Sequence, residues 1–319
     1  VRILMAMVEA CIIGSPGYMP VVILKLLEIT LKKGNSAYAP FAYGVFGIIL
    51  CGAMGRIRRG EAFGRLALKL AHRLERTDLK GRVFYIYGSN IQHWNHHIRE
   101  SLPCLEKARE WALGSGDLSY ASYAINQNLF HLMAAGEPLG QLAGRFQKDA
   151  PVMAATKQKR TIQIFDYIYH CIALLRGDEA CFSPIQAKAY DRLKTYEYWQ
   201  NARDEMGLYS YYHLQMQICF FMGDMAGAAG FLEKETPHLD SVMGMIFYGE
   251  HFFYEAMVFS VLYGEKTRKH RRFFRTIESN LKKLEKWSQY GPFNFKAPYL
   301  LASAQWEGIQ GRGNRAAVL

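Results

Sequence analysis

Apolar and polar positions along the chain follow a repeating pattern of two unequal helices. In each unit, an apolar and aromatic stretch ends at a break, usually a glycine beside a small or polar residue, and a more charged amphipathic stretch follows. A recurring period of 20 to 50 residues is typical of stacked helical repeats. The breaks are 40 to 47 residues apart and lie at Gly14-Ser15, Gly55-Arg56, Asn95, Gly136-Glu137, Gly177-Asp178, Gly223-Asp224, Gly264-Glu265 and Gly311-Arg312.

Glycine at these breaks has a physical reason. A helix commonly ends with a left-handed residue just after its last turn, and glycine adopts that conformation without a Cβ clash. The Asp, Glu or Ser that follows can accept hydrogen bonds from the free N–H groups of the next helix. Such short connections favour antiparallel neighbouring helices.

The second helix of a unit is amphipathic. Phe274, Ile277, Leu281, Leu284 and Trp287 form one helical stripe. The preceding segment, 247–263, is apolar over more of its circumference, so we expect an inner helix paired with an outer one. The pattern predicts one all-α domain over residues 1–319, a right-handed, tetratricopeptide-like solenoid of antiparallel helix pairs with about seven repeats of roughly 41 residues.

One uncharged stretch requires a membrane test. Residues 37–55 contain no charge and are followed by Arg56, Arg58 and Arg59, as in a spanning helix with a positive flank. Pro40 and several glycines interrupt the stretch, and a helix buried between neighbours is also apolar all round. We therefore predict a buried helix and expect no membrane association.

Composition supports a folded protein in a reducing compartment. Hydrophobic residues make up 50% of the chain and charged residues 21%, which is ordinary for a globular protein. The six cysteines form no CxxC pair, so we expect reduced thiols and a cytoplasmic location. The chain opens inside an apolar helical pattern without a starting Met and stops where a new helix begins. We therefore expect a fragment of a longer polypeptide, truncated at both ends.

Several segments resemble the helical-repeat region of very large bacterial signalling proteins. The resemblance covers nearly the whole chain and implies a cytoplasmic multidomain regulator. It implies a Ser/Thr-kinase-like domain and a predicted ATPase before the repeats, and a GAF domain and a histidine kinase after them. The family's catalytic residues lie outside this region, and the chain stops about one helix pair earlier than the family. The matching segments are 42–44, 50–52, 64–68, 93–97, 116–121, 249–254, 280–287 and 294–295.

The sequence contains no motif that assigns chemistry. It has no GxxxxGK[ST] phosphate loop, no HExxH and no GxSxG. His93 and His97 lie one helical turn apart with His96 between them, so they are candidates for one metal ion, but no carboxylate or cysteine completes the set. We expect packed or exposed histidines there, and a capping Glu250 beside a packed His251. We predict no catalytic, cofactor-binding or metal residue.

The chain is basic, with a net charge of +11 and a sequence pI near 9.3. Its densest basic run includes Lys266, Arg268, Lys269, Arg271 and Arg272. Such a run attracts an acidic partner domain, nucleic acid or an anionic surface, although charged runs are usually solvated helix faces. No nucleic-acid recognition motif accompanies it, so a protein partner is favoured over nucleic acid.

Tyrosines on the apolar helices are the other candidate contacts. Tyr167, Tyr169, Tyr209, Tyr211 and Tyr212 either line a binding groove or pack between repeats. We predict a non-catalytic protein-interaction and signal-relay scaffold that contacts other domains of its own polypeptide or a partner protein. The alternative is a stand-alone helical-repeat adaptor or transcription-linked regulator that binds a peptide, a partner protein or nucleic acid.

Overall fold

The computed structural model describes residues 1–14, 16–74, 77–178, 182–185, 190–264 and 270–318. Over these ranges the regular structure is helical, with no strand. The α-helices are α1 (Arg2–Gly14), α2 (Met19–Lys33), α3 (Ala39–Ile48), α4 (Ile57–Arg73), α5 (Thr77–Asn90), α6 (Leu102–Gly114), α7 (Leu118–Ala134), α8 (Leu139–Thr156), α9 (Lys159–Arg176), α10 (Arg192–Ala202), α11 (Glu205–Phe221), α12 (Met225–Glu235), α13 (Ile246–Gly264), α14 (His270–Ser288), α15 (Pro292–Ile309) and α16 (Gly313–Ala316).

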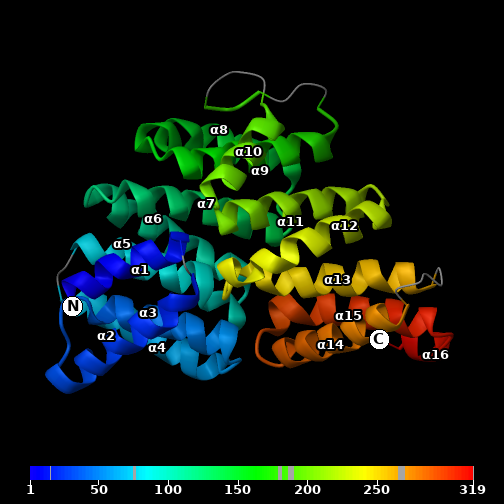
Figure 1. The fold of residues 1–319 in the computed structure, drawn as a ribbon, viewed down its shortest axis with the longest axis horizontal. Coiled ribbons are helices and arrows are strands. Elements are labelled where there is room, and N and C mark those ends of the chain that lie inside the picture. Colours follow the sequence, from blue (N-terminus) through cyan, green and yellow to red (C-terminus); the bar gives the residue numbers. More distant parts are fainter. Residues whose placement is uncertain (15, 75–76, 179–181, 186–189, 265–269, 319) are drawn as a thin grey trace.

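Neighbouring helices pack against one another in pairs. Close contacts join α3 to α4, α5 to α6, α11 to α12 and α13 to α14. The odd-numbered helices also contact one another in sequence, from α3 through α5, α7, α9, α11 and α13 to α15. Figure 1 shows the resulting layers, with α8 to α10 at one edge and both chain ends toward the other. The all-helical, paired arrangement predicted from the sequence is confirmed.

The predicted breaks coincide with helix ends. Five of the glycines have a left-handed backbone, with φ between +58° and +79°: Gly55, Gly136, Gly177, Gly223 and Gly311. At Gly177 this conformation lets the backbone N–H bond to Leu174 O at 3.1 Å, so the last turn of α9 is closed. The residue after Gly223 caps the next helix, since Asp224 Oδ1 accepts from Gly227 N at 2.8 Å. Ser15 and Glu265, each the second residue of a predicted break, lie outside the described residues.

The uncharged stretch forms a buried helix. All but one of the residues of α3 are buried, and a π-helical turn, Ile49–Ala53, continues it. Pro40 occupies the first turn of α3, where a missing N–H costs nothing. In the described part of the chain, no helix is long and apolar enough to cross a bilayer.

The stripe predicted on α14 is correct except at its beginning. Ile277, Leu284 and Trp287 are buried, but Phe274 is 41% exposed and its neighbour Phe273 is buried. Phe273 lies four residues before Ile277, and its ring stacks on Phe259 of α13 at 4.5 Å between centroids. The prediction was wrong at Phe274. Residues three or four positions before Ile277 both fit an apolar stripe, and packing against α13 selects Phe273, four positions before it.

Candidate functional site at the contact between sequence-distant helices

The connection between α5 and α6 contacts helices that lie far from it in the sequence. It consists of two short 3₁₀ turns, Gln92–Trp94 and Ile98–Ser101. Trp94 is fully buried, and its indole Nε1 donates to Asn90 O and to Gly244 O, both at 3.1 Å. Gly244 is 150 residues away in sequence, so this tryptophan joins two distant parts of the chain.

Aromatic packing extends this junction to α14 and α15. The Trp94 ring stacks on Phe295 with 5.4 Å between centroids and meets the edge of Trp287 at 5.4 Å. Aromatic pairs in these geometries contribute about 0.5–1.5 kcal/mol beyond the area they bury. The 3₁₀ turns after α5 therefore pack directly on the first turn of α15.

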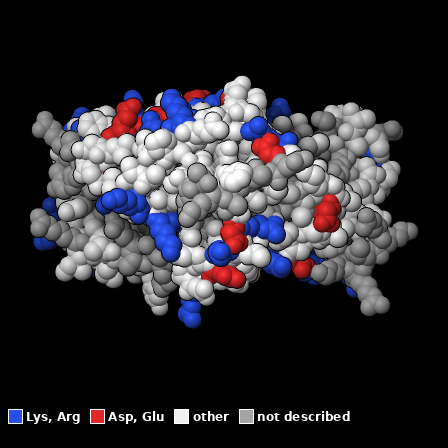
Figure 2. Space-filling view, turned by 90° about the horizontal axis from the view of Figure 1, so that it is seen from above, with Lys and Arg blue, Asp and Glu red and all other residues white. Residues whose placement is uncertain are grey.

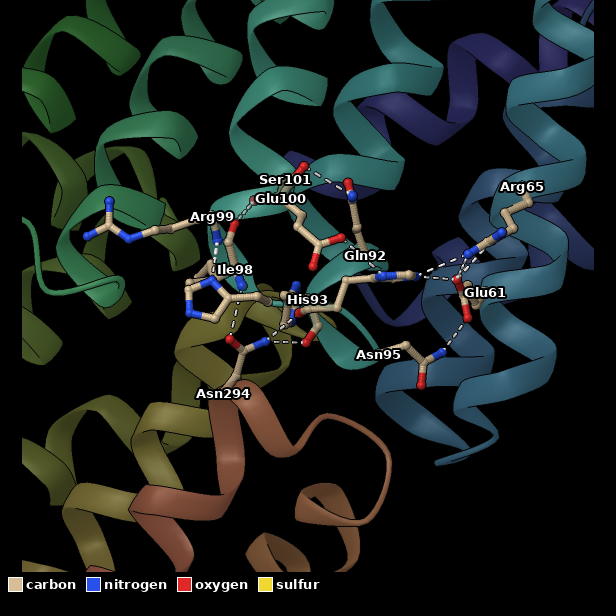
Figure 3. Close-up of polar contacts among 12 residues, drawn as sticks. Glu61, Arg65, Gln92, His93, Asn95, Ile98, Arg99, Glu100, Ser101 and Asn294 are labelled. Atoms are coloured by element: carbon tan, nitrogen blue, oxygen red, sulfur yellow. Dashed lines mark hydrogen bonds and ion pairs between the residues drawn. The ribbon is translucent and has the colours of Figure 1, made fainter.

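Asn294 provides the polar part of the same contact. Its Nδ2 donates to His93 O at 2.6 Å and to His96 O at 2.8 Å, and its Oδ1 accepts from Ile98 N at 3.0 Å. Figure 3 shows this side chain pointing from α15 toward the turns. Backbone groups between two 3₁₀ turns lack regular partners, and one amide satisfies three of them.

The backbone itself comes close at this contact. A Cβ at Gly291 would lie 2.6 Å from Trp94 O, and one at Gly244 would lie 2.7 Å from Ile48 Cγ2. Gly244 also has φ of +86°, a conformation that other residues rarely adopt. We call the set of Trp94, Gly244, Gly291, Asn294 and Phe295 the closure contact.

The three neighbouring histidines face different partners. His93 is fully buried, and its ring lies 6.0 Å from that of His131. His96 Nε2 lies 2.7 Å from Glu61 Oε1, and His97 Nδ1 accepts from Arg99 N at 3.1 Å. The segment is not a regular α-helix, so the spacing that placed His93 and His97 on one face does not apply. Within the described ranges, no group of three or more His, Cys, Asp or Glu residues is placed to hold a metal ion.

Burial determines the protonation of the His93–His131 pair. Burial lowers the pKa of His131 to about 3, while a backbone hydrogen bond to Ser89 acts the other way. Burial, reinforced by repulsion from His131, holds the pKa of His93 well below its ordinary range. Ser101 Oγ lies 2.5 Å from His131 Nδ1, but neither ring nitrogen of His93 has a hydrogen-bond partner among the described residues. Both rings are therefore neutral at pH 7.

A second buried histidine pair lies between α11, α12 and α13. Glu235 is fully buried, with its Oε1 2.6 Å from His251 Nδ1, and its Oε2 lies 3.3 Å from His213 Nδ1. Glu250 Oε2 is 3.2 Å from His213 Nε2. His251 is packed, as expected, but the capping role expected for Glu250 is wrong, because Glu250 lies in the second turn of α13 and pairs with His213. We call Glu235, His213, His251 and Glu250 the charged cluster.

In the charged cluster, attraction between opposite charges shifts the pKa values of the buried groups more strongly than burial does. Burial disfavours a charged His213, but the Glu235 and Glu250 carboxylates raise its pKa to about 9. Burial likewise disfavours a charged Glu235, and the two imidazoles still lower its pKa. His213 is therefore an imidazolium at pH 7, and the cluster contains a buried ion pair.

The predicted tyrosines are mostly interior. Tyr167 and Tyr209 are fully buried, Tyr211 and Tyr212 are at most 9% exposed, and Tyr169 is half-buried. Tyr167 OH donates to Tyr211 O at 3.0 Å, and Tyr209 OH donates to Phe247 O at 3.1 Å. These hydroxyls connect α9 to α11 and α11 to α13, so they hold helix to helix. This is the packing alternative raised by the sequence.

The basic run is described only in part. Lys266, Arg268 and Lys269 lie outside the described residues. Arg271 and Arg272 are exposed, and Arg272 Nη1 lies 3.1 Å from Glu233 Oε1. On the face shown in Figure 2, described Lys and Arg residues are interspersed with Asp, Glu and neutral residues. Among the cysteines, Cys11, Cys51, Cys104 and Cys219 are not in disulfides, Cys171 is buried, and Cys181 lies outside the described ranges.

Comparison with known proteins connects this all-helical chain to signalling proteins. The chain is 26% identical over 142 residues to hybrid signal transduction histidine kinase G of Dictyostelium discoideum. The match covers 44% of this chain but only 4% of the kinase, so the chain spans a small part of that relative. No protein-family model matches the chain, and no solved structure matches it.

Proposed function

We propose that this chain is a non-catalytic interaction and signal-relay scaffold within a multidomain ATPase or kinase signalling protein. The observation that carries the proposal is the similarity to a histidine kinase of which the chain covers only a small part. A segment of that size within a very large signalling protein suits a connector between catalytic modules. The partners are then other domains of the same polypeptide or a separate protein, in the cytoplasm.

The proposed architecture is a right-handed, tetratricopeptide-like solenoid of about seven repeats of roughly 41 residues. Its support is the regular spacing of the breaks and the continuous contact among α3, α5, α7, α9, α11, α13 and α15. Stacked repeats contact mainly their neighbours, so a displacement at one end passes along the array. The closure contact adds a direct connection between residues about 150 to 200 positions apart.

The closure contact is where a relay is most easily tested. Its polar half depends on Asn294, whose side chain takes no part in the aromatic stack of Trp94 and Phe295. The experiment first sequences the complete open reading frame and expresses its product. Kinase activity is then compared between the wild type and Asn294→Ala, with Asn201→Ala on the exposed face of α10 as the matched control.

We expect Asn294→Ala to change the output activity and Asn201→Ala to leave it unchanged. The 319-residue chain alone should hydrolyse no ATP. Intrinsic ATP hydrolysis by this chain would overturn the non-catalytic assignment. Faster hydrogen exchange at the Ile98 amide would show that Asn294→Ala has opened the closure contact. If the kinase activity of that protein were nevertheless unchanged, the relay would be overturned. A reading frame without catalytic modules would support the stand-alone adaptor instead.

A further inference from the structure

A largely apolar cavity of about 230 Å³ lies inside the helical array. Its walls come from α2, α3, α5, α7, α9, α11 and the segment before α13, so they join residues far apart in the chain. An engineered apolar cavity of about 150 Å³ stays free of water and binds benzene. A cavity of 230 Å³ therefore has room for a larger molecule, such as one with two fused rings.

The lining is suited to ring systems. Aromatic walls come from Phe41, Tyr85 and Tyr120, while Met206 and Met243 are half-buried beside them. Methionine side chains are flexible and polarizable, and they adapt to the faces and edges of aromatic rings. Protein cores usually contain only small voids. A larger space with apolar, half-buried residues in its lining is more typical of a ligand site than of a packed core.

The polar groups of the cavity define the charge of its ligand. Arg160 is the cationic side chain there, and it is already paired, because both of its donating nitrogens that contact Asp204 reach separate carboxylate oxygens. The Arg160–Asp204 pair leaves little net charge for an anionic ligand to neutralise, and the exposed Asp240 carboxylate, which also lines the cavity, would repel an anion. Asn90, which is buried, accepts from Ser89 Oγ through its side-chain oxygen, and its amide nitrogen carries two N–H donors. The Asn90 amide is thus a donor that the lining offers to a ligand.

The backbone beside the cavity is also unusual. The π-helical turn Ile49–Ala53 contributes Ile49 and Ala53 to the lining. Such turns are rare and occur frequently at functional sites. The cavity therefore combines volume, a largely apolar lining that suits rings, the Asn90 donor and an irregular helix.

We propose that this cavity binds a small, neutral, ring-containing molecule with one hydrogen-bond acceptor. The rings lie among Phe41, Tyr120 and the methionines, and the acceptor faces the Asn90 amide. The assignment is independent of the relay proposed above, since a scaffold without kinase modules would retain the same cavity. Ligand binding would stabilise the packing of α3 and α5 against the segment before α13.

Two matched probes test the proposal on the 319-residue chain. The first is 2-acetylnaphthalene, whose ketone accepts a hydrogen bond, and the second is 2-ethylnaphthalene, which has the same rings and no acceptor. Affinities are measured by ligand-detected NMR titration. Saturable binding of both is expected, with the ketone bound about tenfold more tightly because one buried hydrogen bond discriminates.

Two substitutions at opposite ends of α11, Met206 in its first turn and Met222 just after its last residue, provide the matched pair. Met206→Trp fills the cavity and should weaken both probes about tenfold or more. Met222→Trp makes the same change at the exposed end of α11 and should leave the affinities unchanged. Asn90→Leu should abolish the preference for the ketone over the hydrocarbon. Thermal unfolding verifies the fold of each variant, and Met243→Trp replaces Met206→Trp if the latter does not fold.

The opposite results would overturn the assignment. Non-saturable binding to the wild type would show that the cavity is not a ligand site. Equal loss of affinity in Met206→Trp and Met222→Trp would place the probes elsewhere on the surface. A ketone preference that persists in Asn90→Leu would remove Asn90 from the site and contradict the proposed ligand class.

Discussion

The two buried histidine pairs of this chain share a residue type and a depth but differ in their partners. His213 and His251 lie against the buried carboxylate of Glu235, whereas His93 and His131 face one another and form no ion pair with any carboxylate that the structure describes. The pKa of His213 is raised to about 9, and that of His131 is lowered to about 3. Burial alone therefore does not determine whether a histidine carries charge in this protein.

The difference assigns distinct structural roles to the two pairs. The charged cluster joins α11, α12 and α13 through interactions that depend on protonation. The neutral pair fills space beside the closure contact, where the hydrogen bonds run through the His93 carbonyl instead of its ring. Changes of charge or pH should therefore affect the stability of the charged cluster most. Changes of side-chain shape or of backbone hydrogen bonds should affect the region around His93 most.

The largest expected effect is at the charged cluster. His213→Leu removes one charge and leaves the buried Glu235 with fewer partners, so unfolding should become easier by about 3–5 kcal/mol. Urea-induced unfolding monitored by circular dichroism measures the change. His72→Leu, on the exposed side of α4, is the control and should change stability by no more than about 0.5 kcal/mol. Equal losses of stability in His213→Leu and His72→Leu would show that the charged cluster does not stabilise the fold more than an exposed histidine does.

Alkaline pH should act on the same cluster. A histidine whose folded pKa is raised from 6.5 to about 9 contributes stability that is complete below pH 6.5 and lost as pH rises through 9. The loss between pH 6.5 and pH 10 should approach about 3 kcal/mol at 1.36 kcal/mol per pKa unit. Urea midpoints measured across this range should fall in the wild type. In His213→Leu the fall should be smaller, and an identical fall would contradict the assignment.

The helical architecture was predictable because its determinants are local. Gly177 and Gly223 end helices through their own backbone conformation, and Asp224 caps the next helix from an adjacent position. The sequence did not show which phenylalanine of α14 is buried, because Phe273 and Phe274 both fit a helical stripe. Packing against α13 buries Phe273. Local chemistry thus determined where helices begin and end, and packing determined their rotation.

The candidate sites depend on contacts that no local pattern contains. Asn294 bonds to residues about 200 positions earlier, and Glu235 meets its two histidines from a different helix. Two signals were nevertheless present in the sequence. Trp94 lies in a break that lacks glycine, which is an unusual place for a large aromatic residue, and Glu235 ends a helix just before a proline. Pairing them with their distant partners required the folded chain.

The closure contact should show an intermediate effect. Asn294→Ala leaves His93 O, His96 O and Ile98 N without their shared partner, at a cost of about 1–3 kcal/mol. Hydrogen exchange at the Ile98 amide should accelerate together with the loss of stability. Asn201→Ala on α10 is exposed and should change neither measurement. A stable protein with fast exchange at Ile98 would mean that the closure contact opens independently of the core.

The smallest effect is expected at His93, and it separates the two histidine pairs most directly. His93→Leu removes a ring whose nitrogens have no partner among the described residues, so stability at pH 7.5 should change by no more than about 1 kcal/mol. The folded pKa of His93 is lowered, so its stabilising contribution is present above pH 6.5 and is lost as pH falls below that value. The variant should therefore lose stability more slowly than the wild type between pH 6.5 and pH 4.5 in urea titrations. A loss at pH 7.5 as large as that of His213→Leu would show that the His93 ring has a polar role, and the contrast between the pairs would fail.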